Sequence, residues 1–266
     1  MNHPVPLSEE ELEVLTQKYG LNEAASSFSE YESASGVGIG GLVPLSALLE
    51  PGSCAAYLDG LAVRIGTDSR PIAASMFAKR YAAVAVVPYL HALTCYDKAL
   101  ELVFESMLLR SGKHWLEGIT VDRPLRAVPR AEWREAWRSH VAERWIRCHL
   151  TSLWQALSSC SGLPAAILWE NTAVRIYSLY EKKLPATGAV AASRIEDDFR
   201  YLLHGLPAEA FKQRRQPFAR FYGGGAAIEE ARNLGCRGSR PRLTCCLYYR
   251  VSREGDYCDA CPKHVR

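Results

Sequence analysis

The spacing of apolar and polar residues predicts a chain built mostly of helices. The clearest pattern covers residues 129–160, where large apolar residues recur mostly three to five positions apart and Arg and Glu fill the other positions. This spacing is typical of one long amphipathic helix with an apolar face turned toward a core. The residues predicted to form that face are Trp133, Trp137, Val141, Trp145, Leu150, Leu153, Trp154 and Leu157.

Further helices are predicted from similar patterns and from their boundary residues. Ser8 followed by Glu11 is a capping box that opens a helix over residues 9–18. The alanine-rich stretch 71–92 indicates a longer helix that is kinked or ends near Pro88, because proline lacks the backbone N–H that a helix interior needs. The remaining predicted helices cover residues 43–50, 53–66, 165–184, 191–205 and 226–233.

One stretch departs from helical spacing. Residues 100–123 alternate imperfectly between apolar and polar and carry Gly112 and Lys113 near their middle, which indicates an antiparallel hairpin. The predicted fold class is therefore α+β and predominantly helical: a helical bundle with a small antiparallel sheet and a cysteine-rich C-terminal segment. The predicted division is an N-terminal helical and loop region (1–70), a main helical domain (71–205) and a loop-rich C-terminal segment (206–266).

Composition narrows the class of protein. The chain has 266 residues, of which 48% are hydrophobic and 23% charged, as in ordinary soluble globular proteins. A net charge of +3 gives no strong global field, so we expect no nucleic-acid partner. The first residues show no secretory signal pattern, and the longest apolar-rich run (81–94) is shorter than the roughly 20 residues that span a membrane. We therefore expect a cytoplasmic protein without a transmembrane segment.

The nine cysteines fall into two groups. Structural disulfides are rare in a reducing compartment, and an odd number of cysteines argues against a fully paired framework. Four cysteines are scattered among apolar neighbours and are predicted to be plain core residues, because free cysteine is among the most buried residue types: Cys54, Cys95, Cys148 and Cys160.

Four other cysteines cluster near the C-terminus in a pattern that indicates a metal centre. Cys258 and Cys261 form a C-x2-C pair, whose sulfurs can face a single metal ion. Cys245 and Cys246 are adjacent, and neighbouring side chains of a regular strand point to opposite faces, so both reach one centre only through a local bend or across a wider centre. A two-iron cluster is wider than one zinc ion and spreads four thiolates over two irons. The spacing favours iron–sulfur slightly and leaves zinc open.

A resemblance to a known family adds to this argument. The stretch R-x-T-C-C-L-Y-Y-R followed by C-D-A-C-P resembles the C-terminal signature of ferric-siderophore reductases of the FhuF type. In that family the four cysteines bind a [2Fe-2S] cluster, although the spacer between the two pairs is one residue longer here. The resemblance therefore implies four cluster ligands: Cys245, Cys246, Cys258 and Cys261.

Two weaker matches to the same family lie upstream. The first is ILWENTAV, with Trp169 and Asn171, and the second is the stretch from Ser75 to Leu93, with Lys79, Arg80 and Tyr81. Trp169 is interpreted as a core residue. Asn171 is predicted to brace a backbone loop rather than to contact a siderophore.

The resemblance implies a cytoplasmic iron–sulfur oxidoreductase that reduces Fe(III)-siderophore complexes and releases Fe(II). Its expected partners are the ferric siderophore, an electron donor such as a ferredoxin or a flavoprotein reductase, and an inner-membrane siderophore transporter with which it associates peripherally. One-electron reduction needs no acid, base or nucleophile, and the sequence shows no convincing triad or carboxylate pair. The alternatives are a zinc-stabilised interaction module and an iron–sulfur electron carrier or sensor.

Basic residues are concentrated around the cysteine motif. From Arg232 to Arg266, seven Arg and one Lys face three acidic residues, a local excess of five positive charges. Arg250 and Arg253 lie in the spacer between the cysteine pairs and are predicted to dock an anionic siderophore complex or an acidic electron donor. The alternative is that the basic residues offset the negative charge of the cluster. Cys236 lies outside the family pattern and is interpreted as a bystander.

Overall fold

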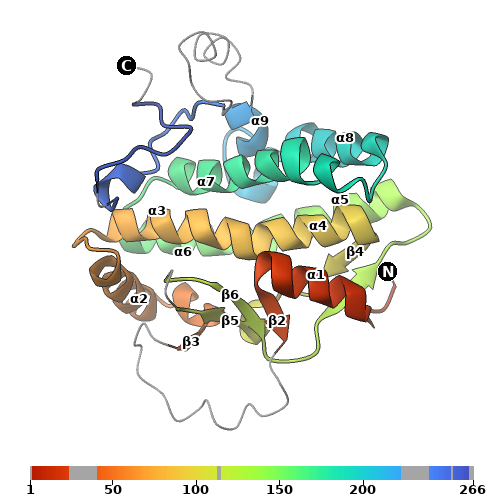
Figure 1. The fold of residues 1–266 in the computed structure, drawn as a ribbon, viewed down its shortest axis with the longest axis horizontal. Helices are drawn as coiled ribbons and strands as arrows, with labels where there is room; N and C mark the ends of the chain where they lie inside the picture. Colours follow the sequence, from red (N-terminus) through yellow and green to blue (C-terminus); the bar gives the residue numbers. More distant parts are fainter. Residues whose placement is uncertain (1, 24–40, 113–114, 223–239, 253, 264–266) are drawn as a thin grey trace.

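The computed structural model describes residues 2–23, 41–112, 115–222, 240–252 and 254–263. Within these ranges the chain is predominantly helical with two small sheets (Figure 1), which confirms the predicted α+β class. The α-helices are α1 Glu9–Tyr19, α2 Pro51–Arg64, α3 Arg70–Tyr81, α4 Val87–Tyr96, α5 Arg134–Trp145, α6 Thr151–Ser161, α7 Ala165–Ser178, α8 Ala192–Arg200 and α9 Pro217–Tyr222. Short 3₁₀ helices are η2 Leu45–Leu49, η4 Phe104–Ser106, η7 Pro185–Thr187, η9 Ala208–Phe211 and η10 Tyr248–Arg250.

Turns of π-helix extend or join several of these helices: η3 Ala82–Val86, η5 Ile146–Leu150, η6 Leu179–Lys183 and η8 Tyr201–Gly205. The turn η3 joins α3 to α4 into one long helix, and η5 joins α5 to α6 in the same way. The chain therefore stays helical through Pro88, so the alternative that this helix ends there is wrong. Pro88 follows directly on the wider π turn, where the regular hydrogen-bond ladder is already interrupted and a missing N–H costs least.

The predicted hairpin is present, but the sheet that contains it is not wholly antiparallel. That sheet has the order β2-β6-β5-β3 (Leu21–Glu23, Gly118–Val121, Met107–Arg110, Leu42–Pro44). In the hairpin β5 pairs antiparallel with β6, with Leu109 opposite Ile119, whereas β2 pairs with β6 in parallel. A second antiparallel sheet has the order β1-β7-β4 (Val5–Pro6, Arg126–Pro129, Lys98–Leu100). Strand β2 has only 3 residues, too few to show an alternation of apolar and polar positions, so the sequence did not predict it.

The capping box predicted for the first helix is confirmed. Ser8 Oγ accepts a hydrogen bond from Glu11 N at 3.2 Å, and Glu11 Oε2 accepts one from Ser8 N at 2.8 Å. The helix ends at Gly20, whose φ of 72° turns the chain directly into β2.

The long helix formed by α3 and α4 crosses the middle of the molecule (Figure 1). On one side of it lie α7, α8 and α9, and on the other lie α1, α2 and the larger sheet. One continuous hydrophobic cluster runs from Leu15 to Phe221. Trp137, Trp145 and Trp154 are buried in it as predicted, but Trp133 is 75% exposed. Trp133 is the N-cap of α5, so it lies just before the helix. The helical spacing of apolar residues from which its burial was predicted therefore does not extend to it.

Among the predictions about single cysteines, the one for Cys148 is wrong and the one for Cys236 lies outside the described residues. Cys54 is buried and Cys95 and Cys160 are partly buried, but Cys148 is exposed and is not a core residue. Cys148 lies in the π turn η5, where one extra residue per turn shifts the helical register. Cys236 and the predicted helix 226–233 lie outside the described residues. The division of the chain into three regions stays a prediction.

The C-terminal segment packs against the helices instead of forming a layer of its own. Apart from η10, the described residues after 240 form neither helix nor strand. They lie beside α3 and α7 (Figure 1). Among the helices that the structure describes, none is both long enough and apolar enough to cross a membrane.

Candidate metal centre

The two cysteine pairs are brought together by turns in the backbone. Leu247, directly after the adjacent pair, has a φ of 63°, and its N–H lies 3.4 Å from Cys245 Sγ. This left-handed residue provides the local bend that the adjacent cysteines require. In the second pair, Cys261 N donates to Cys258 O at 2.9 Å and closes a tight turn. As a result Cys246 Sγ and Cys258 Sγ lie 3.4 Å apart.

A side chain of helix α3 binds the backbone of the first cysteine pair. Ser75 Oγ donates to the carbonyl oxygen of Cys246 at 2.7 Å. From α7, Asn171 Nδ2 donates to Ser75 O at 3.0 Å and to Ser75 Oγ at 3.1 Å. All three residues are buried, with exposed fractions of 2% or less. Asn171 therefore braces backbone, but the backbone is that of helix α3 and not of a loop as predicted, and it reaches the cysteine segment through Ser75.

A buried carboxylate on α7 binds the backbone of the residues that directly precede the same cysteine pair. Glu170 is 1% exposed and accepts hydrogen bonds from Leu243 N at 2.6 Å and from Thr244 N at 2.8 Å. The hydroxyl of Thr244 also donates to Glu170, and Arg242 Nη2 lies 3.7 Å from its carboxylate. Arg242 N donates to Ala260 O at 2.9 Å, which ties the two halves of the segment together. Sequence reasoning missed Glu170, although an acid inside the apolar run ILWENTAV was the available signal.

The surroundings favour a thiolate at Cys246. The pKa of Cys246 is lowered to about 5, chiefly by its hydrogen bond with the Cys258 thiol and further by the charges of Arg242 and Lys79. The same hydrogen bond raises the pKa of Cys258. Burial raises the pKa of Cys245. Because the thiolate is the form that binds metal, the buried cations beside Cys246 favour metal loading there.

Two basic side chains on the helices lie against this segment. Lys79, on α3, has its Nζ 4.4 Å from the centroid of the Tyr248 ring. Burial lowers its pKa, and the neighbouring Cys246 and Cys258 act in the opposite direction. Burial also lowers the pKa of Arg175 on α7. Neither side chain was assigned a binding role by the sequence, although Lys79 falls within one of the weaker family matches.

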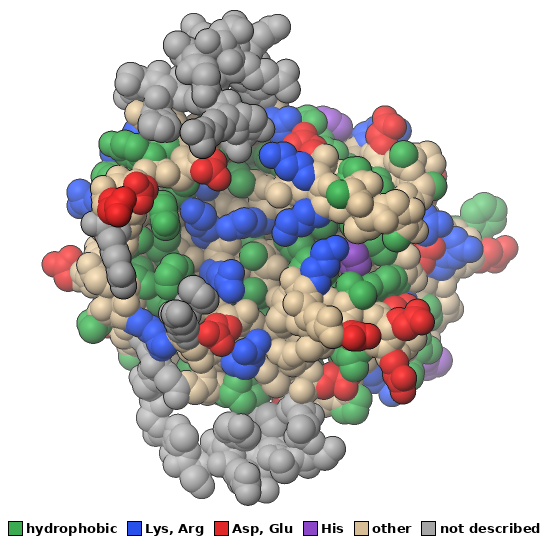
Figure 2. Space-filling view, viewed as in Figure 1, with side chains coloured by type: hydrophobic (Ala, Val, Ile, Leu, Met, Phe, Trp, Pro, Cys, Tyr) green, Lys and Arg blue, Asp and Glu red, His purple; other side chains and the backbone are tan. Residues whose placement is uncertain are grey.

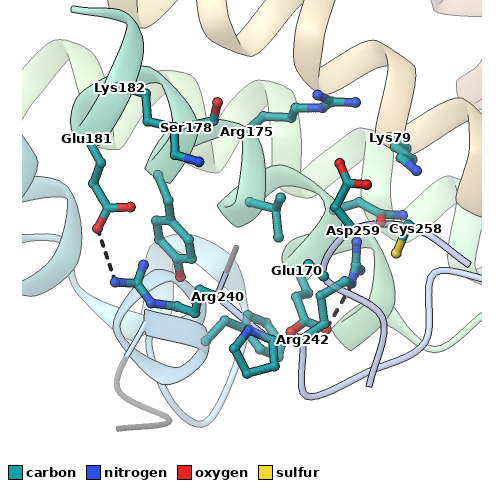
Figure 3. A pocket seen from close by; sticks show the side chains of 16 residues that line it. Lys79, Glu170, Arg175, Ser178, Glu181, Lys182, Arg240, Arg242, Cys258 and Asp259 are labelled. Atoms are coloured by element: carbon teal, nitrogen blue, oxygen red, sulfur yellow. Dashed lines mark hydrogen bonds and ion pairs between the residues drawn. The ribbon is translucent and has the colours of Figure 1, made fainter. Parts of the chain in front are cut away.

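A pocket of about 330 Å³ opens between α7, α3 and the C-terminal segment. Cys258 and Lys79 lie at one end of it, and Glu181 and Arg240 lie at the other (Figure 3). Arg175 projects from α7 between these ends, and Lys182 projects from η6 toward the end that holds Glu181. One of the predicted cluster ligands is therefore part of a pocket wall.

The predicted docking residues lie elsewhere. Arg250 is exposed on η10, with its guanidinium carbon 5.9 Å from the centroid of the Tyr249 ring, and it does not line this pocket. Arg253 lies outside the described residues. The docking role of both arginines stays a prediction.

The donor chemistry of the segment fits an iron–sulfur cluster. It supplies four cysteine sulfurs, of which Cys246 and Cys261 are 2% and 3% exposed, and it places cations beside the thiolate. Among the residues that the structure describes, no three His, Cys, Asp or Glu side chains converge closely enough to enclose a single ion. The fit therefore lies in the four soft donors, two of them buried and two half-buried. Fold and site together define a predominantly helical protein with a C-terminal cysteine centre of the iron–sulfur type.

Comparison with known families agrees with this class. Residues 75–227 match the family described as ferric iron reductase FhuF-like transporter, and residues 242–263 match the FhuF 2Fe-2S C-terminal domain. The first match covers more than half of the chain, so the chain belongs to the FhuF-like family. The C-terminal match supports a [2Fe-2S] cluster and replaces the zinc alternative. Compared with curated protein sequences, the chain has no significant match.

Solved structures show a related fold in a larger protein. The aerobactin synthetase IucA from a hypervirulent pathotype of Klebsiella pneumoniae superposes with a TM-score of 0.51 and 11% identity over 80% of this chain. Its ATP-bound form gives a TM-score of 0.49 and 11% identity over 74% of this chain. The present chain covers 48% and 44% of those two chains, which is less than half of their length. At this identity the likeness concerns the fold alone.

Proposed function

We propose that this protein is a ferric-siderophore reductase and that Cys245, Cys246, Cys258 and Cys261 hold its [2Fe-2S] cluster. When bound, the cluster supplies a one-electron reductant. The observation that carries the proposal is the position of Cys258, which is half-buried on the segment and lines an open pocket. A large Fe(III) complex bound there would lie against the cluster without entering the core.

The reaction requires the protein to bind and orient its substrate and to admit an electron. The Fe(III) of the siderophore complex gains one electron, its charge falls, and its hard oxygen donors hold it less tightly, so Fe(II) leaves. The electron comes from outside the chain, from a ferredoxin or a flavoprotein reductase. We propose that the reaction takes place in the cytoplasm, where the protein associates peripherally with an inner-membrane siderophore transporter.

The structure suggests what the chain itself contributes. Ser75 and Glu170 fix the backbone of the segment on α3 and α7, so the position of Cys258 relative to the pocket is set by the helices. No proton has to move for the electron to pass.

Anaerobic single-turnover reduction tests this proposal. Protein loaded with its cluster and reduced by dithionite, then freed of excess reductant, is mixed with ferric hydroxamate, catecholate and carboxylate complexes in the presence of an Fe(II) chelator. Loss of the reduced visible spectrum together with formation of the Fe(II)–chelator complex is expected. Loaded protein that stays reduced with every complex would instead favour an electron carrier or a sensor.

A further inference from the structure

The pocket beside Cys258 contains more positive than negative charge. Its basic lining residues are Lys79, Arg175, Lys182, Arg240 and Arg242, and its acidic ones are Glu170, Glu181 and Asp259. Two of the cations are paired with acids: Arg240 lies 3.0 Å from Glu181, and Arg242 lies 3.7 Å from Glu170. Glu170 is further occupied by its hydrogen bonds to the segment. The remaining cations therefore face a single remaining acid, Asp259.

The three remaining cations have no ion-pair partner among the described residues. Lys79 contacts the Tyr248 ring, and neither Arg175 nor Lys182 forms a salt bridge within the part of the chain that the structure describes. Asp259 is exposed. Lysine and arginine side chains normally bind a carboxylate or water. Three of them gathered in one pocket leave N–H donors available to a ligand.

A second hollow extends the basic surface on the far side of Lys79 and Arg175. It has a volume of about 440 Å³ and is lined by these two residues together with Met76, Arg80, Trp115 and Tyr248, without an acidic residue. Figure 2 shows Lys and Arg side chains forming a band across this face, where α3 and α7 run side by side. We use the name α3–α7 basic pocket for the two hollows that meet at Lys79 and Arg175.

We propose that the α3–α7 basic pocket binds the Fe(III) complex and selects complexes with a net negative charge, such as those of catecholate ligands. This inference rests on the proposed function and names its substrate class. Arg175 offers a planar fork of N–H donors to the anionic oxygens that surround the iron, and Lys182 offers a point charge at the outer end. The residues proposed to recognise the substrate are thus Arg175 on α7 and Lys182 on the π turn η6 that follows it.

Charge balance with the cluster does not account for all of these cations. Four thiolates and two sulfides around two ferric ions leave a net negative charge, and Lys79 and Arg175 are close enough to Cys246 for their charges to interact with it. Lys182, however, lies toward the end of the pocket that is remote from Cys258 (Figure 3). The charge of Lys182, which is exposed, is therefore available to a ligand in the pocket and is not explained by the cluster.

Gallium(III) complexes separate binding from reduction, because Ga(III) has the charge and nearly the size of Fe(III) and is not reduced. Cluster-loaded protein is dialysed to equilibrium against the Ga(III) complex of a tris-catecholate ligand, which is anionic, or of a neutral tris-hydroxamate ligand, and the gallium retained is measured. The variants are Arg175→Gln and Lys182→Gln. The matched control is Arg214→Gln, an exposed arginine outside the pocket.

The parent is expected to retain the anionic complex in preference to the neutral one. Each pocket variant should weaken that binding about tenfold or more, as for a lost charge-assisted hydrogen bond, and raised salt should weaken the parent's binding. The control should bind as the parent does. The visible spectrum and the iron content of the cluster should be unchanged in Lys182→Gln.

The outcomes distinguish the two proposals. Unchanged gallium binding in both variants, no binding by the parent, or equal binding of anionic and neutral complexes would overturn the pocket assignment even if reduction is observed. Charge-dependent gallium binding by a protein that fails to reduce the matching Fe(III) complex would overturn the reductase function and leave the pocket assignment intact. A loss of cluster rather than of binding in Lys182→Gln would show that the cation serves the cluster.

Discussion

The hydroxyl of Ser75 donates to the carbonyl oxygen of Cys246 across 171 positions of sequence, at 2.7 Å. Through this contact a helix in the middle of the fold holds the backbone of one proposed cluster ligand. Ser75 is itself held by Asn171 on α7, so two helices and the cysteine segment meet at one buried group of hydrogen bonds. The helices therefore support the metal centre in addition to the hydrogen bonds within the segment itself.

Replacing Ser75 by Ala should loosen this junction without changing a ligand. The change removes the hydrogen bond that Ser75 Oγ donates to Cys246 and the one that it accepts from Asn171. The free energy of unfolding of the loaded protein should therefore fall by about 1–3 kcal/mol, the range for buried groups left unsatisfied, and iron should pass to a chelator faster than from the parent. Urea unfolding and the decay of visible absorbance under chelator measure the two effects. Ser106→Ala is the matched control, because Ser106 is equally buried and its Oγ bonds only to the carbonyl of Val103. Equal iron release from both variants would contradict a support role for Ser75.

Serine in place of any of the four clustered cysteines should lower or abolish iron and sulfide content, because a hydroxyl is a poor donor for this centre. The four changes are Cys245→Ser, Cys246→Ser, Cys258→Ser and Cys261→Ser. Cys148→Ser, at an exposed position away from the segment, is the control and should load fully. Iron and sulfide analysis after identical reconstitution decides the matter. The ligand assignment fails if the Cys246 variant loads fully.

Changing Glu170 to Gln should loosen the backbone of Leu243 and Thr244, which directly precede the first cysteine pair. The carboxylate accepts from two backbone N–H groups and one hydroxyl, whereas an amide offers one oxygen and turns N–H donors toward the others. Amide hydrogen exchange at Leu243 and Thr244 should accelerate, with a local loss of about 1–3 kcal/mol for buried groups left unsatisfied. Glu209→Gln, at an exposed position, should leave this exchange unchanged. Unchanged protection in the Glu170 variant would mean that other contacts hold the segment.

Much of this arrangement could be read from the sequence, and the reasons for the exceptions are physical. The four clustered cysteines, the capping box at Ser8 and the hairpin depend on local spacing, which a sequence displays directly. The π turns have no such local signature in the sequence. One extra residue per turn leaves the amino-acid composition unchanged, yet it moves the Cys148 side chain toward solvent. Contacts between distant positions, such as Glu170 with Leu243 and Thr244, have no local signature.

The basic pocket was missed for a related reason. The sequence places Arg250 and Arg253 between the two cysteine pairs, and position along the chain was the available guide. In the folded protein Arg175 on α7 and Lys182 on η6 line the pocket beside Cys258, while Arg250 lies outside it. Proximity in space is set by helix packing, which single-sequence spacing does not show.

Acid should destabilise the protein through its buried histidines. Burial lowers the pKa of His149 from 6.5 to about 3, and His149 lies 2.6 Å from the hydroxyl of Tyr81. The unfolded chain therefore takes up a proton that the folded protein excludes, so stability is full above pH about 6.5 and falls as the pH drops toward about 3. The loss from His149 at pH about 5 should be about 2 kcal/mol.

Urea unfolding at several pH values measures this loss. The variant His149→Gln keeps a polar partner for Tyr81 and removes the titration, so its stability should depend less on pH than that of the parent. His91, whose pKa burial lowers to about 4, should account for part of the remaining dependence. An identical pH profile for variant and parent would show that His149 is protonated without cost in the folded state.

The spacer arginines remain open to a direct test. If Arg250 and Arg253 steer charged partners, changing both to Glu should slow the reduction of anionic ferric complexes at low salt, and the difference should shrink at ionic strength above about 0.1 M. Stopped-flow rates across a salt series, with cluster content checked in each sample, measure this. Slowing by the same factor for neutral and anionic complexes at every salt concentration would show that these residues support the centre rather than dock a partner.

The order of elements along the chain has a consequence for how the protein matures. Among the described residues, the buried members of the hydrophobic cluster lie between Leu15 and Phe221, whereas the four clustered cysteines follow it, and their backbone anchors Ser75, Glu170 and Asn171 belong to helices made earlier. During synthesis the ribosome therefore releases the platform before the thiols that will rest on it. Iron and sulfide would then be added to cysteines whose anchoring residues on α3 and α7 were synthesised earlier.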